Sequence, residues 1–155
     1  MKKPVALGAI LSLGACASGG GTPPPPAPLA EDRGQPVLAL FEHALTDYFA
    51  SVGAGGPTVC PELRPTALAA EQEQALIVRF VRLAPAERCK PGESGPVDAI
   101  TGEPAALVQV YDFGCTGAGT CRGWVQLPNV PAVRYAMRFE DDEWQFDSDR
   151  RILAE

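Results

Sequence analysis

A strict two-residue alternation of apolar and polar side chains near the C-terminal end restricts the fold more than any other feature of this sequence. Its apolar members are Val133, Tyr135, Met137, Phe139, Trp144 and Phe146. Asp141-Asp142 interrupts the pattern and suits the two-residue turn of a β-hairpin. In that hairpin Phe139 lies opposite Trp144 and Met137 opposite Phe146, all on one face. The result is a sheet with one apolar face, which needs a covering layer.

Strands are also predicted directly upstream of this hairpin. Segments 97–100 and 105–113 flank a Gly/Pro-containing turn and predict another hairpin. The longer of these strands runs into Cys115, and a further strand over 123–127 returns from Cys121. These strands and the final hairpin together predict an antiparallel meander.

The first half of the domain shows helical spacing instead. Apolar residues recur every three or four positions over 36–52, and the Gly/Pro cluster at 53–57 ends this helix. Segment 58–60 predicts a short strand. Segment 67–82 is ambiguous, because its second half fits a buried strand whereas its Glu and Gln residues favour a helix. We interpret it as a helix that ends before Pro85.

Helices followed by a meander with one apolar face predict an α+β fold in which the helices pack on that face. This order resembles the cone-shaped rolls of the nuclear-transport-factor-2-like and cystatin-like superfamilies. The resemblance is topological, and such rolls host enzymes, binding proteins and inert domains alike. Rolls of this type that act as isomerases or dehydratases carry acids and tyrosines in the cone. The resemblance therefore implies that, if this domain is an enzyme or binds a small ligand, it has a deep cavity lined by Asp112, Tyr111 or Tyr135.

The N-terminal end has the pattern of an export signal. Lys2 and Lys3 precede an apolar run that is too short to cross the ~30 Å of a bilayer as a helix. The motif Leu13-Gly14-Ala15-Cys16 then resembles the lipobox of bacterial lipoproteins. In that family the cysteine receives a diacylglycerol, the signal is cut before it, and the new amine is acylated. The resemblance implies a signal peptide over 1–15 and lipidation of Cys16 as the membrane anchor.

Residues 16–34 are expected to form a tether between this anchor and a single domain over 35–155. The tether combines a glycine triplet with a proline ladder that favours extended polyproline conformation. Ala17 stands where inner-membrane lipoproteins of many Gram-negative species carry aspartate, so the resemblance implies the outer membrane, facing the periplasm or the cell surface.

Four cysteines remain after Cys16, namely Cys60, Cys89, Cys115 and Cys121. An even number in an exported chain predicts disulfides, with three pairings possible. Cys115 and Cys121 flank a short flexible loop and are expected to pair, which leaves Cys60 with Cys89. No CxxC spacing is present and the only histidine is distant, so a metal site is not favoured. No cofactor is expected.

The formal charge of −6 disfavours nucleic acid as a partner, because an acidic domain is repelled by phosphate backbones. His43 and Asp47 are one helical turn apart. They lie off the apolar stripe, with His43 nearly opposite its centre, which indicates a solvated surface pair and not a catalytic dyad.

Trp124 is the best candidate for a binding residue. If Cys115 and Cys121 pair directly across the hairpin, Trp124 falls opposite Asp112 and shares a face with Val108 and Val110. The opposite face would then carry Tyr111, Phe113, Val125 and Leu127. An exposed indole can anchor a partner, although a helix or the chain end could also cover it.

These observations predict a small, acidic, outer-membrane lipoprotein that acts by binding or as envelope structure, with an unidentified envelope protein as partner. Two alternatives remain open. One is a pocketed roll with hydrolase, isomerase or small-ligand function. The other is an anchored enzyme inhibitor, for which the loop from Cys115 to Cys121 would protrude.

Overall fold

The computed structural model describes residues 24–149. The elements are α1 (Pro36–Val52), β1 (Thr58–Leu63), α2 (Ala70–Arg79), the 3₁₀ turn η1 (Ala86–Arg88), β2 (Cys89–Gly92), β3 (Gly95–Asp98), β4 (Ala105–Gly117), β5 (Thr120–Gln126), β6 (Val133–Glu140) and β7 (Glu143–Asp149). The predictions on 1–15, Cys16 and Ala17 lie outside the described residues.

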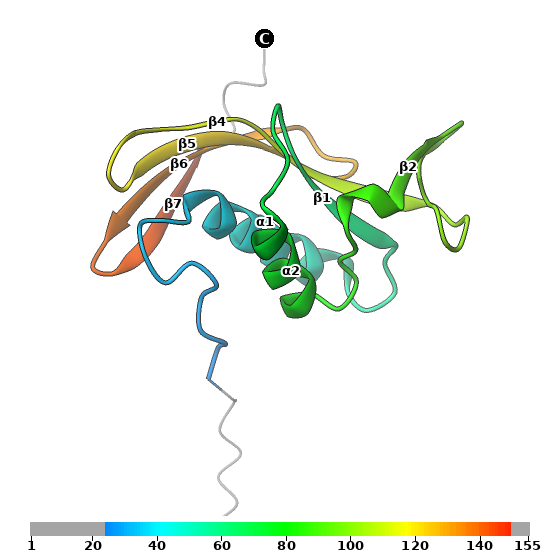
Figure 1. The fold of residues 1–155 in the computed structure, drawn as a ribbon, viewed down its shortest axis with the longest axis horizontal. Coiled ribbons are helices and arrows are strands. Elements are labelled where there is room, and N and C mark those ends of the chain that lie inside the picture. Colours follow the sequence, from blue (N-terminus) through cyan, green and yellow to red (C-terminus); the bar gives the residue numbers. More distant parts are fainter. Residues whose placement is uncertain (1–23, 150–155) are drawn as a thin grey trace, which may run out of the picture.

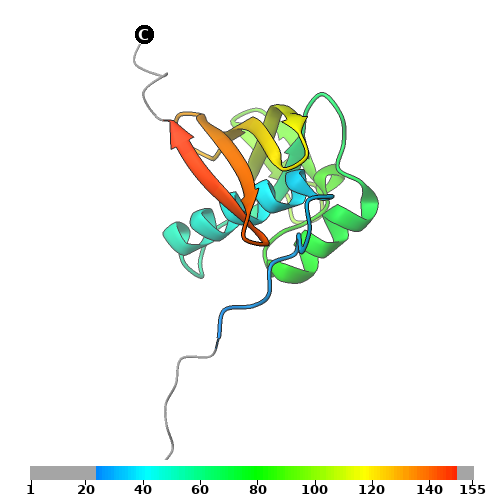
Figure 2. The same ribbon diagram turned by 90° about the vertical axis from the view of Figure 1, so that its left-hand side faces the viewer.

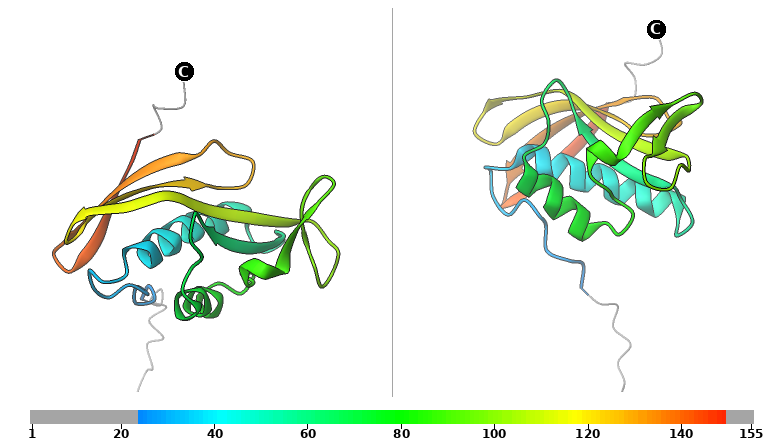
Figure 3. Two further views of the ribbon diagram at one scale, coloured as in Figure 1. Left: turned by 45° about the horizontal axis from the view of Figure 1, so that its top comes forward. Right: turned by 45° about the vertical axis from the view of Figure 1, so that its right-hand side comes forward.

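Five strands form the main sheet in the order β1-β4-β5-β6-β7, and both helices lie on one of its faces (Figure 1). Strands β4 to β7 are the expected antiparallel meander, which confirms the α+β fold with helices before strands. Strand β1 adds a parallel partner to β4 that the sequence did not indicate. The small β2–β3 ribbon lies beside the N-terminal end of β4 (Figure 3).

Helix α1 has the bounds that its sequence predicted, since Pro36 occupies the first turn and Gly53 follows at a positive φ of 62°. Its buried residues are Leu38, Ala39, Leu40, Phe41, Ala44, Leu45 and Tyr48. Four consecutive buried positions cannot lie on one side of a helix. The sheet covers one side of α1. Helix α2 and residues 29–33 cover other sides.

Segment 67–82 combines the two interpretations. Residues up to Arg79 are helical, as we favoured, but the helix ends three residues earlier than expected. The chain then extends along the free edge of β1. The Val59 N–H donates to the Arg82 carbonyl at 3.0 Å, and the Ala84 N–H donates to the Val59 carbonyl at 2.8 Å. The apolar end of the segment therefore covers an open strand edge.

The prediction that segments 97–100 and 105–113 pair as a hairpin is wrong. Strand β3 pairs with β2, and one isolated bridge between Val97 and Pro104 is its link to the start of β4. The turn itself is present, because the Asp98 N–H donates to the Glu103 carbonyl at 2.9 Å. The pattern missed β2 because its residues, Cys-Lys-Pro-Gly, show no alternation.

Both predicted disulfides are present. Cys60 and Cys89 tie β1 to β2 with their Cα atoms 6.1 Å apart. Cys115 and Cys121 are direct partners across the β4–β5 hairpin. This hairpin loop is held against β6, since the Phe139 N–H donates to the Gly119 carbonyl at 2.8 Å.

The final hairpin has the predicted register, with Phe139 opposite Trp144 and Met137 opposite Phe146. Asp141 and Asp142 have φ of 53° and 62°, as a type I′ turn requires. Its apolar face lies over α1 (Figure 2), and Met137 is fully buried there.

Part of the expected tether packs with the domain. The Leu29 N–H donates to a Glu42 carboxylate oxygen at 2.7 Å, and Ala30 is buried. Arg79 contacts the same carboxylate at 3.5 Å and donates to the Ala27 carbonyl. Ordered packing thus begins several residues before α1, on the helix side of the sheet (Figures 1 and 2).

Candidate functional site

The candidate site lies on the sheet face that points away from α1 and α2, which we call the outer face. Tyr111 on β4 is paired with Trp124 on β5, and Trp124 is paired with Arg134 on β6. The neighbours Val110 and Val125 are fully buried on the helix side, so Tyr111 and Trp124 lie on the outer face. Their rings are nearly parallel, at 5°, with centroids 6.2 Å apart.

This pairing corrects the prediction that Trp124 lies opposite Asp112 and on the same side as Val108 and Val110. The register of β4 against β5 shifts between Tyr111 and Gly114, because β4 carries one extra residue there. Asp112 occupies this bulge with a φ of 49°. Aspartate tolerates such a conformation better than most residues. A direct count back from the disulfide cannot detect the extra residue.

The bulge also separates Tyr111 from Phe113, which we had placed on one face. Phe113 turns inward and packs against the core, whereas Tyr111 stays outside. The inner side of Gly123 is filled by Phe113, whose Cδ2 would lie 2.9 Å from a Cβ at this position. A β-bulge that changes the direction of side chains in this way is common beside functional sites.

Two arginines stand beside the aromatic pair. Arg122, on β5, is exposed and Arg134 is half-buried. Neither side chain has a hydrogen bond or an ion pair with any residue between 24 and 149. The outer face is hollowed here by about 200 Å³, and we call this the outer hollow. It is lined by Asp112, Arg122, Gly123, Trp124 and Arg134.

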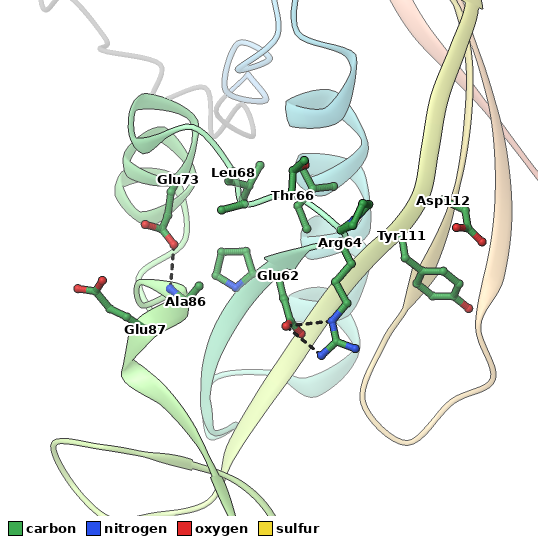
Figure 4. A pocket seen from close by; sticks show the side chains of 13 residues that line it. Glu62, Arg64, Thr66, Leu68, Glu73, Ala86, Glu87, Tyr111 and Asp112 are labelled. Carbon is green, nitrogen blue, oxygen red and sulfur yellow. Dashed lines mark hydrogen bonds and ion pairs between the residues drawn. The ribbon is translucent and has the colours of Figure 1, made fainter.

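A larger cleft of about 850 Å³ adjoins the outer face, between the β1–α2 connection, η1 and β4 (Figure 4). Some of its polar groups bind one another or neighbouring residues. Arg64 contacts Glu62 at 2.9 Å, Gln109 also donates to Glu62, and Glu73 accepts the Ala86 N–H at 2.8 Å. Figure 4 shows Tyr111 and Asp112 at the far side of the cleft from Glu73. Asp112 therefore borders both depressions.

The residues expected in a catalytic pocket are not brought together. Tyr135 lies on the helix side, where its ring meets the edge of His43 at 5.5 Å, whereas Tyr111 and Asp112 are on the outer side. His43 itself is 3.8 Å from Asp47, as expected for the pair. Its solvated position opposite the core is wrong, because the final hairpin curls over α1 and Phe146 stacks on the imidazole at 4.2 Å.

Asp98 is a fully buried carboxylate that the sequence did not reveal. It accepts two hydrogen bonds from Arg88, at 2.8 and 2.7 Å, one from Thr58 and one from the Ile100 N–H. The Arg88 guanidinium, supported by these donors, holds the pKa of Asp98 well below its usual range despite burial. The cluster connects β3 to β1 beside the Cys60–Cys89 bridge, so its role is structural.

Within residues 24–149, no helix is long and apolar enough to span a bilayer, and no group of three potential metal ligands is found. Comparison with family models, curated proteins and solved structures gives no match for this chain. The site must therefore be interpreted from its own geometry.

Proposed function

We propose that this chain is a lipid-anchored protein of the bacterial outer membrane whose domain binds an envelope component through the outer face. The carrying observation is the parallel pair of Tyr111 and Trp124 beside Arg122 and Arg134, which have no partners in the described part of the chain. Charged groups that serve structure are normally paired, as Arg88 and Asp98 are. Cations without such partners beside a partly exposed indole favour recognition of a ligand.

The position of the tether supports the same proposal. Residues 24–34 leave the domain on the helix side, opposite the outer face (Figures 1 and 2). This part of the chain, which leads to Cys16, therefore leaves the outer face uncovered and accessible. Two disulfides agree with an oxidising compartment such as the periplasm or cell surface.

The anchor is tested with Cys16→Ser. Because lipidation needs the thiol, this variant should take up no labelled palmitate and should remain uncleaved by signal peptidase II. Lipidation and membrane fractionation equal to the wild type would show that the anchor is misassigned.

The binding face is tested by capturing envelope components from detergent extracts with wild-type protein and with Trp124→Ala. The variant should retain its fold but capture much less of whichever component the wild type captures. Arg138→Gln is the matched control, since Arg138 is an exposed outer-face residue already paired with Glu140 at 3.4 Å. Equal capture by Trp124→Ala and wild type would exclude the outer face as the binding surface.

A further inference from the structure

The outer hollow has the features of a subsite for one charged ring. We propose that it binds a carboxylated sugar unit of an envelope glycan, with the sugar ring on the indole of Trp124 and the carboxylate between Arg122 and Arg134. This inference rests on the proposed function, because it names the ligand class of the same face.

The aromatic part of the site favours a flat, partly apolar ligand. The rings of Tyr111 and Trp124 are parallel within 5° and extend across two neighbouring strands. An aromatic face is electron-rich and attracts the slightly positive C–H groups on the face of a pyranose ring. The indole N–H of Trp124 has no acceptor among residues 24–149, so it is available for a ligand oxygen.

The charges of the hollow favour a single negative charge. Its lining holds the guanidinium groups of Arg122 and Arg134 and the carboxylate of Asp112. The lining residues therefore carry one net positive charge, which matches a monoanionic carboxylate better than a dianionic phosphate. Arginine binds carboxylates through two parallel hydrogen bonds, and Asp112 can accept hydrogen bonds from sugar hydroxyls.

Size and surroundings restrict the ligand further. About 200 Å³ is below the ~300–1,000 Å³ of pockets for drug-sized molecules, so the hollow suits one unit of a longer chain. Neighbouring units would pass over Tyr111. A nucleic acid fits poorly, because the exposed outward positions of β7 include Glu143 and Asp147, and these carboxylates would repel a continuous row of phosphates.

The inference is tested by calorimetric titration of the full-length protein in detergent with a glucuronate-containing tetrasaccharide and with its carboxyl-reduced form. We expect the reduced form to bind about tenfold more weakly or worse, since charge-assisted hydrogen bonds are lost. Arg122→Gln and Arg134→Gln should each cause a similar loss, and Trp124→Ala should abolish binding. Arg138→Gln should bind as the wild type does.

Several results would overturn this inference. Equal affinity for the acidic and reduced tetrasaccharides would exclude the carboxylate, and unchanged affinity in Trp124→Ala would move the site elsewhere. If a single-stranded oligonucleotide binds more tightly than the acidic tetrasaccharide, the ligand of the outer hollow is a polyanion and not a carboxylated sugar. If the acidic tetrasaccharide does not bind while Trp124→Ala still loses its captured envelope component, the sugar assignment fails and the proposed function stands.

Discussion

The two tryptophans of this domain occupy opposite faces of one sheet and differ in what satisfies them. Trp144, on the helix side, contacts Phe139 edge to face and donates its indole N–H to the Asp32 carbonyl at 3.2 Å. Trp124, on the outer face, stacks on Tyr111 and has no hydrogen-bond acceptor within the described range. Both are partly exposed, so exposure alone does not separate them. What separates them is whether the indole N–H has a hydrogen-bond acceptor among residues 24–149.

The charged clusters show the same contrast. The Asp98 carboxylate is buried and fully paired, whereas Arg122 and Arg134 in the outer hollow have no partner among residues 24–149. A domain of this size cannot leave a buried charge without a partner, but it can leave exposed ones for a ligand. The contrast thus separates groups that hold the fold from groups that are available for binding.

Removal of Arg88 should have the largest effect on stability. Asp98 is 1% exposed and Arg88 is 31% exposed, so Arg88→Ala leaves a buried carboxylate without its main partner. Losing this partner should lower the free energy of unfolding more than Trp144→Ala does, as measured by urea denaturation. Arg138→Ala, which breaks an exposed ion pair, should cost less than about 1 kcal/mol. Similar losses in both variants would contradict the contrast.

Trp144→Ala should cost about 3 kcal/mol, the lower end for removing a large aromatic residue, because the side chain is only half-buried. Part of the loss arises at the contact with residues 29–33. Thermal denaturation should therefore show a lowered melting temperature. An unchanged melting temperature would mean that the final hairpin does not help to hold the N-terminal segment.

Acidification should weaken the domain through Asp98. Its pKa is lowered by folding, so the ionised group stabilises the fold above the ordinary aspartate pKa of ~3.9, and this contribution is lost as the pH falls further. The gap in unfolding free energy between wild type and Asp98→Asn should therefore narrow from pH 5 to pH 3. If this difference does not change with pH, the Asp98 carboxylate is not the group that makes the stability depend on pH.

Trp124→Ala should have the smallest effect on stability. Its melting temperature should stay within a few degrees of the wild type, because the ring covers no core residue. This makes the variant suitable for the binding experiments above. Unfolding as severe as that of Trp144→Ala would show that Trp124 belongs to the packing and remove the basis of the candidate site.

The parts that could be predicted are those in which several local signals agree. Helix α1 has helical spacing, Pro36 at its start and glycines after its end. The β6–β7 register follows from alternation together with a two-residue turn. Both disulfides follow from a short loop and the elimination of other partners.

The rest depends on single residues or on long-range packing. The bulge at Asp112 shifts the register by one position without altering any periodic pattern, and this moved Trp124 to the wrong partner. His43 was misplaced because the curl of the sheet over α1 is a tertiary property. Nothing in the sequence distinguishes Arg122 and Arg134 from other surface arginines, because their lack of a partner within the described range is visible only in the structure.

The packing of residues 27–33 across the helices has a mechanical consequence. A pulling force along an N-terminal tether would first act on the Leu29–Glu42 and Arg79–Ala27 hydrogen bonds. It would then act on the hydrogen bond from the Trp144 indole N–H to the Asp32 carbonyl. These contacts join the segment to α1, α2 and β7, so the force is shared by three elements before the chain enters α1. Tyr111 and Trp124, on the inner strands β4 and β5, are outside this path. Drag on a bound glycan and tension in the tether would therefore be transmitted through the domain from opposite sides.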